Sequence, residues 1–132
     1  MNEKKNFIVG LYPRVSTEDQ SRYGHSLDEQ EESMKKLCDF KGYTIYKIYR
    51  EEGVSAKSMD RPKFQEMIDD LKRGKINKII VYKLDRLTRS IQDLESICKL
   101  IEETDTSLES VSEEINTDTA TGKFFIRMTT IL

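Results

Sequence analysis

The order of apolar and polar positions along the chain predicts strands that alternate with helices. Short apolar runs at residues 7–12, 43–49 and 78–84 are typical of strands, and a less regular run at 108–111 predicts a fourth. Between these runs, apolar residues recur at intervals of three and four, which is the spacing of one face of a helix. The predicted helices cover residues 26–42, 62–74, 90–101 and 119–132.

Local signals mark the ends of these helices. Ser26 and Glu29 form a capping box, in which each side chain can bond the backbone N–H of the other residue. Pro62 suits the first turn of a helix, and Ser90 is of a type that commonly caps one. Gly42 suits the left-handed turn that often ends a helix.

Strands and helices that alternate in this way are typical of an α/β domain. We therefore expect a three-layer sandwich, in which helices flank a central, mainly parallel sheet of four to five strands. In such sheets the functional groups gather at the carboxyl ends of the strands. Two candidate segments lie there, because residues 14–17 follow the first predicted strand and residues 85–89 follow the third.

Composition and charge narrow the class of protein. The 132 residues suit one domain with its own core, and the net charge of −2 argues against a free-standing DNA-binding module, which is usually basic. Charge is nevertheless segregated, since residues 93–118 are strongly acidic and residues 72–89 are strongly basic. A basic segment in an acidic domain indicates a focused site for an anion. Its basic side chains are Lys72, Arg73, Lys75, Lys78, Lys83, Arg86 and Arg89.

Other classes lack their signatures in this sequence. No apolar run has the length of a membrane span, and the first residues lack the apolar core of a signal peptide, so we expect a cytoplasmic protein. Cys38 and Cys98 lie on apolar helix faces, where reduced core cysteines are expected. His25 is the only histidine, and neither metal-ligand spacing nor a phosphate-binding P-loop occurs.

Ser16 is the candidate nucleophile, and arginines rather than a histidine accompany it. Arg14 precedes it by two residues, while Arg61, Arg86 and Arg89 come from other segments. Guanidinium groups bind phosphate oxygens through paired N–H donors and can stabilise a pentacovalent transition state. A serine after a strand is more often a turn or cap residue, and surface arginines are mostly solvated. From spacing alone, the sequence predicts an α/β domain with a possible anion site.

The motifs resemble one family. Tyr12–Thr17, followed by Gln20, is similar to the Y-x-R-V-S-T-x-x-Q signature of the serine recombinases, the resolvase and invertase superfamily. The segment from Ser112 to Gly122 resembles the family's lead-in to a long final helix. Together the blocks are most similar to the large serine recombinases, which are phage integrases and transposases of mobile elements. The blocks between these two segments, in family order, are Gly24–Gln30, Glu52–Ala56, Arg61–Pro62 and Val81–Ser90.

This resemblance implies a resolvase-like catalytic domain and a reaction. Ser16 would attack a DNA phosphodiester, form a 5′-phosphoserine bond and free a 3′ hydroxyl, after which the strands exchange and rejoin. Family members act as homodimers on each DNA site and as tetramers during exchange, and their chemistry needs no metal or other cofactor. The implied residues are Ser16, Arg14, Arg61, Asp85, Arg86, Arg89 and Gln30 for catalysis, and Ser55, Lys83 and Gln20 for substrate binding.

Two features depart from the family pattern. Pro13 removes a backbone N–H just before Arg14, which leaves the local strand pairing open. The chain also ends early in the long final helix, of which residues 119–132 are present. We therefore expect residues 1–132 to be one catalytic domain, truncated in that helix and lacking a downstream DNA-binding region.

Two other functions remain as alternatives. The first is a non-catalytic α/β module that uses the fold for dimerisation or regulation, although Ser16 and all four arginines are retained. The second is a phosphoesterase in which water is the final acceptor. Convergence of the candidate groups in the structure would argue against the first, and turnover of simple phosphodiesters would indicate the second.

Overall fold

The computed structural model describes residues 6–15, 26–53, 61–88, 90–113 and 115–117. A five-stranded sheet in the order β3-β1-β5-β6-β7 forms the centre, and β2 and β4 form a separate pair. The first four strands of the large sheet are parallel, and β7 is antiparallel to β6. This confirms the mainly parallel sheet. The strands are β1 (Ile8–Leu11), β2 (Arg14–Val15), β3 (Thr44–Ile48), β4 (Glu51–Glu52), β5 (Lys78–Val81), β6 (Ser107–Ser110) and β7 (Ile115–Asn116).

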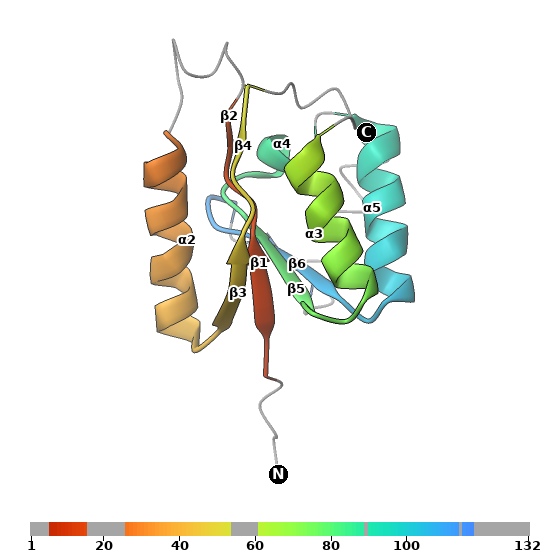
Figure 1. Cartoon of the computed structure of the whole chain (residues 1–132), viewed down its shortest axis with the longest axis horizontal. Helices are drawn as coiled ribbons and strands as arrows, with labels where there is room; N and C mark the ends of the chain where they lie inside the picture. The colour runs from red at the N-terminus through yellow and green to blue at the C-terminus, as the bar shows by residue number, and fades with distance from the viewer. Residues whose placement is uncertain (1–5, 16–25, 54–60, 89, 114, 118–132) are drawn as a thin grey trace.

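Helices cover both faces of the sheet, which confirms the three layers (Figure 1). On one face, Met34 and Cys38 of α2 pack against Val9, Leu11 and Ile80 of the strands. On the other face, α3 and α5 pack against the sheet through a larger apolar core. The helices are α2 (Leu27–Lys41), α3 (Pro62–Lys72), α4 (Leu84–Leu87) and α5 (Ile91–Glu103).

The helix caps at Ser26, Gly42 and Ser90 are confirmed, the first through one of the two bonds of the predicted capping box. The Ser26 hydroxyl accepts the Glu29 N–H at 3.1 Å, and Gly42 ends α2 with φ at 76°, a left-handed conformation that suits glycine. At the start of α5, the Ser90 hydroxyl accepts the Asp93 N–H at 3.2 Å. These bonds satisfy backbone groups that have no partner within a helix.

The third predicted strand is too long, because β5 ends at Val81 and Leu84 already begins the one-turn helix α4. The sequence pattern also gave no indication of the short strands β2, β4 and β7. Such short elements depend on contacts with distant segments, which periodicity does not report. The predicted final helix, residues 119–132, lies outside the described residues.

Pro13 interrupts the strand without ending its pairing. β1 stops at Leu11 and β2 starts at Arg14, yet the carbonyls of Leu11 and Pro13 accept the N–H groups of Tyr49 and Glu51 at 2.8 and 2.9 Å. Arg14 and Val15 then pair with Glu51 and Glu52 in parallel register. The proline therefore removes a donor, while its carbonyl continues the ladder toward the next strand.

Candidate functional site

The candidate site lies at the carboxyl ends of the central strands. β2, β4, α4 and the first turn of α3 meet at this end of the molecule (Figure 1). β2 continues the direction of β1, while α4 follows β5 in the chain, and β1 and β5 are parallel neighbours. The topology thus brings together residues that are about 70 positions apart, as the α/β pattern predicts.

Arg14 reaches from β2 to α4. Its side chain is fully buried, its Nε donates to the Arg86 carbonyl at 2.7 Å, and its Nη2 donates to the Asp85 carbonyl at 3.1 Å. The planar guanidinium group suits two neighbouring acceptors of this kind. Arg14 therefore fixes α4 through the backbone of two consecutive residues.

Arg61 takes the next carbonyl of the same helix. This arginine lies at the start of α3, is fully buried, and donates from Nη1 to the Leu87 carbonyl at 2.6 Å and to the Tyr12 hydroxyl at 3.2 Å. Its guanidinium carbon lies 4.4 Å from the centroid of the Phe64 ring, which suits a cation–π contact. Two arginines from different elements thus bind three consecutive carbonyls of α4.

Gln30 supports Arg14 through the backbone. The Arg14 N–H donates to Gln30 Oε1 at 3.2 Å, and Gln30 Nε2 donates to the Arg14 carbonyl at 3.0 Å. The side-chain amide therefore satisfies both backbone groups of one residue, as a neighbouring strand would. Gln30 is fully buried in the first turns of α2, so it ties that helix to β2.

Asp85 and Arg86 lie on α4 itself. The Asp85 side chain is half exposed, whereas Arg86 is buried, and Asp85 Oδ1 lies 3.9 Å from Arg86 Nε. Lys83 precedes the helix and is partly buried. The structure thus brings together most of the candidate residues that it describes. We call this group the α4 cluster; its members are Arg14, Gln30, Arg61, Asp85 and Arg86.

The remaining candidates lie outside the described residues. Ser16 follows β2 directly in the sequence, and Arg89 lies between Thr88 and Ser90 in the sequence. Gln20 and Ser55 fall within residues 16–25 and 54–60. Their roles stay predictions.

Sequence reasoning assigned no role to Glu51 or to the Tyr12 hydroxyl. Glu51 Oε1 accepts the Tyr12 hydroxyl at 3.2 Å and the Phe64 N–H at 3.0 Å, and Oε2 accepts the Lys63 N–H at 3.3 Å. A carboxylate from β4 therefore caps α3, whose own N-cap, Arg61, makes no side-chain capping bond. Burial raises the pKa of Tyr12 well above its usual range, so this hydroxyl stays protonated. The available signal was a helix start without a capping side chain.

The described basic side chains of residues 72–89 do not all lie at one place, and whether Arg86 and Arg89 form the focused anion site stays a prediction. Lys72, Arg73 and Lys75 are exposed at and after the carboxyl end of α3, whereas Arg61 at the opposite end contacts α4. Eleven helical residues separate the two ends by about 16 Å. Lys78 is buried elsewhere in the sheet. Folding therefore divides a segment that is continuous in the sequence.

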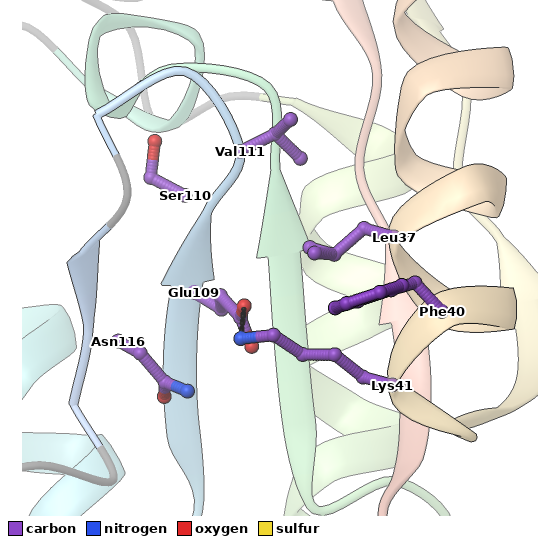
Figure 2. Close-up of a pocket in the computed structure, with 7 residues that line it drawn as sticks. All are labelled: Leu37, Phe40, Lys41, Glu109, Ser110, Val111 and Asn116. Atoms are coloured by element: carbon purple, nitrogen blue, oxygen red, sulfur yellow. Dashed lines mark hydrogen bonds and ion pairs between the residues drawn. The ribbon is translucent and has the colours of Figure 1, made fainter.

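Lys41, Glu109 and Asn116 line a pocket of about 290 Å³ (Figure 2), and the buried Lys78 bonds to two of them, Glu109 and Asn116. Glu109 Oε1 accepts Lys78 Nζ at 3.1 Å and the Tyr43 hydroxyl at 2.7 Å, while Oε2 accepts Lys41 Nζ at 2.5 Å. Lys78 Nζ also donates to Asn116 Oδ1 at 3.0 Å. We call this group the sheet cluster; its members are Lys41, Tyr43, Lys78, Glu109 and Asn116.

Two further observations concern metals and membranes. Within the described parts of the chain, no three His, Cys, Asp or Glu side chains lie together as metal ligands would. None of the helices described is long and apolar enough to cross a bilayer. The Cys38 thiol is buried, which raises its pKa to about 11, as expected for a core cysteine.

Comparison with known sequences places the chain in a protein family. The family profile described as "Resolvase, N terminal domain" matches residues 9–132. The Tn917 resolvase of Enterococcus faecalis is 35% identical over 117 residues, which are 89% of this chain and 56% of that protein. The DNA-invertase hin of Salmonella typhimurium is 30% identical over 122 residues, which are 92% of this chain and 56% of that protein. The chain thus spans just over half the length of these relatives.

Comparison with solved structures agrees with this result. The N-terminal catalytic domain of TP901-1 integrase has a TM-score of 0.82 at 31% identity, covering 91% of this chain and 88% of that one. A resolvase family site-specific recombinase from Streptococcus pneumoniae has a TM-score of 0.78 at 31% identity, covering 93% of this chain and 83% of that one. The fold, the ordered motifs and the profile match together show that this chain belongs to the resolvase N-terminal domain family.

Proposed function

We propose that the chain is the catalytic part of a site-specific recombinase that cuts and rejoins DNA through Ser16. The observation that carries this proposal is the convergence of Arg14, Arg61 and Arg86 around α4. Ser16 stands two positions after Arg14 in the sequence. A serine beside several guanidinium groups suits attack on a phosphodiester, whose extra negative charge in the transition state these groups stabilise.

The chemistry is a transesterification that needs no outside energy. The Ser16 Oγ loses its proton and attacks the phosphorus, a bond forms between Oγ and the 5′ phosphate, and the 3′ oxygen leaves and takes up a proton. After strand exchange, a 3′ hydroxyl attacks the phosphoserine and the serine is released. One phosphoester bond replaces another at each step, so rejoining requires no nucleoside triphosphate.

The arginines have one role in the free protein and a second with DNA bound. In the free protein, Arg14 and Arg61 donate to neutral carbonyls of α4 and are fully buried. A charged phosphate oxygen is a stronger acceptor than a carbonyl. We propose that the scissile phosphate takes over some of these donors when the surrounding segments rearrange on DNA binding. Arg86 and Arg89 would complete the set, with Asp85 holding Arg86 and Gln30 holding the backbone of Arg14. Ser55, Lys83 and Gln20 would contact the DNA beside it.

The partners follow from the same proposal. DNA is the substrate, and a homodimer would occupy each recombination site and pair into a tetramer for exchange. Because the chain spans just over half of the curated relatives, we assign the reading of the DNA sequence to segments beyond these 132 residues. The few basic side chains of the α4 cluster, in a domain with a net charge of −2, give only weak affinity for the DNA backbone by themselves.

The test is capture of a covalent protein–DNA adduct. The full-length protein is incubated with DNA from its own genomic locus, the reaction is stopped with detergent, and the adducts are digested and sequenced. We expect 5′ ends blocked by a peptide that contains Ser16, together with 3′ ends that a polymerase can extend. Ser16→Ala should abolish the adducts, while Ser96→Ala, which removes an exposed hydroxyl on α5, should leave them unchanged.

Two outcomes would contradict the proposal. Adduct formation by a folded Ser16→Ala protein would show that another residue is the nucleophile. Rapid turnover of bis(p-nitrophenyl) phosphate without any trapped DNA adduct would instead indicate a phosphoesterase. Circular dichroism of each variant checks that the fold is retained.

A further inference from the structure

The amino end of α4 is bound by a carboxylate from the turn between β6 and β7. Glu113 Oε1 accepts the Leu84 N–H at 2.8 Å, and the same oxygen accepts the Ser110 hydroxyl at 2.5 Å. Leu84 is the first residue of α4, so its N–H has no partner within the helix. Ser110 is buried at the end of β6, which fixes the direction from which Glu113 approaches.

This contact continues the pairing between two segments that leave the sheet side by side. The Val111 N–H donates to the Val81 carbonyl at 3.0 Å, and the Ser112 N–H donates to the Tyr82 carbonyl at 2.9 Å. The next contact in this series is made by the Glu113 side chain. The turn after β6 is thereby joined to the segment after β5 up to the first residue of α4.

α4 is too short to be stable by itself. It has four residues, and the Thr88 N–H that follows it donates to the Leu84 carbonyl at 3.0 Å. Isolated helices of this length do not persist in water, because nucleation costs more than one hydrogen bond returns. Contacts at its two ends therefore decide its position: Arg14 and Arg61 bind the carbonyls, and Glu113 binds the first amide.

We infer that Glu113 is a positioning residue for α4 and, through α4, for Asp85 and Arg86. This inference rests on the proposed function, because α4 carries residues assigned to the scissile phosphate. Glu113 acts on the backbone of Leu84 and does not touch the DNA. Its loss lets the amino end of α4 move, while Arg14 and Arg61 still bind the other end. The rate of DNA cleavage depends on the placement of Arg86, so a loose α4 lowers the rate more than the affinity for DNA.

The test compares three substitutions in the full-length protein. Glu113→Ala removes the acceptor, Glu113→Gln keeps an acceptor oxygen at the same place without the charge, and Glu103→Ala removes an exposed carboxylate at the far end of α5 as a control. For each protein, amide hydrogen exchange at Leu84 is measured by NMR on the 132-residue chain and adduct formation is measured at saturating DNA. Circular dichroism and thermal unfolding show whether each variant is folded. If Glu113→Ala does not fold, Ser110→Ala replaces it, because it removes only the hydroxyl that binds Glu113.

We expect Glu113→Ala to speed exchange at Leu84 at least tenfold and to slow adduct formation about tenfold, with DNA affinity changed less than twofold. Glu113→Gln should restore most of both quantities, and Glu103→Ala should match the unsubstituted protein. The inference is overturned if Glu113→Ala cleaves at the original rate, if Glu113→Gln is as impaired as Glu113→Ala, or if the change lies in DNA affinity alone. Absence of adducts in the unsubstituted protein would contradict the proposed function, whereas the exchange at Leu84 still tests the contact with Glu113 separately.

Discussion

Positive charge is buried in two regions of this domain and is accommodated differently in each. In the sheet cluster, the ammonium groups of Lys78 and Lys41 bind the carboxylate of Glu109. In the α4 cluster, the hydrogen bonds described for Arg14 and for Arg61 go to backbone carbonyls and to the Tyr12 hydroxyl. A carboxylate cancels charge, whereas a neutral carbonyl satisfies a donor and leaves the formal charge in place.

The difference separates stability from function. The charged groups of the sheet cluster bind one another and are not available to a ligand, so we assign this cluster to the stability of the fold. The described bonds from Arg14 and Arg61 to carbonyls fix these guanidinium groups in position without neutralising them, and the Glu51 carboxylate reaches Arg61 through the Tyr12 hydroxyl. Burial of charge is therefore informative only together with the chemical nature of its partner.

The largest expected effect is in the sheet cluster. Glu109→Leu removes the carboxylate that balances the buried Lys78, and removing one member of a buried pair typically costs about 3–5 kcal/mol of unfolding free energy. Urea denaturation of the 132-residue chain measures this loss. The double variant Glu109→Leu/Lys78→Met should recover most of it, because two apolar side chains replace the pair. A single variant as stable as the original would contradict the assignment of this cluster to the fold.

The second effect is expected in the α4 cluster and in activity. Arg86→Met keeps a long apolar side chain but removes the charge, so adduct formation should fall about 10²- to 10³-fold, as for loss of one electrostatic group at a reaction centre. The unfolding free energy should change by less than it does in Glu109→Leu. Adduct trapping and urea denaturation of the same variant give both values. A large loss of stability with unchanged activity would show that the α4 cluster, like the sheet cluster, serves the fold.

A third difference concerns high pH. Burial raises the pKa of both Tyr12 and Tyr49, so each keeps its proton in the folded state above pH 10, where the unfolded chain loses it. Stability from these groups is complete below pH 10 and should fall by about 1.4 kcal/mol per pH unit for each tyrosine above it. Urea denaturation from pH 9 to pH 11 measures the slope. Tyr12→Phe and Tyr49→Phe should each lessen it, and an unchanged slope in both would contradict this origin.

The smallest effect is expected at the exposed edge of the sheet cluster. Lys41 is about one-third exposed, and Glu109 keeps Lys78 and Tyr43 as partners without it. Lys41→Met should therefore cost about 1 kcal/mol or less, and the cost should shrink as salt is added. Denaturation at low and high ionic strength tests this. A cost equal to that of Glu109→Leu would show that the two lysines are equivalent.

The sequence predicted the layers and the convergence of the candidate arginines, for a physical reason. Helix and strand periodicity reports which residues face a core, and parallel strands bring their carboxyl ends to one edge, so Arg14 and Arg86 were placed together correctly. Motifs supplied what periodicity could not, namely the choice of Ser16. Its placement, like that of Arg89, stays a prediction.

Contacts between distant segments could not be predicted in the same way. The capping of α3 by Glu51 and of α4 by Glu113 joins residues 12 to 29 positions apart, and nothing local marks them as partners. Likewise, the basic segment 72–89 looked like one unit only because charge was counted along the chain. Folding sent Lys78 into the sheet and left Lys75 exposed.

The amide of Gln30 has a consequence for the solubility of this domain. A short strand such as β2 has two edges, and an edge with free N–H and C=O groups can recruit a strand from another molecule and begin aggregation. β4 pairs with β2 on one side, and Gln30 binds both backbone groups of Arg14. The buried Gln30 side chain thus prevents a strand of another molecule from pairing with β2, the segment that precedes Ser16 in the sequence.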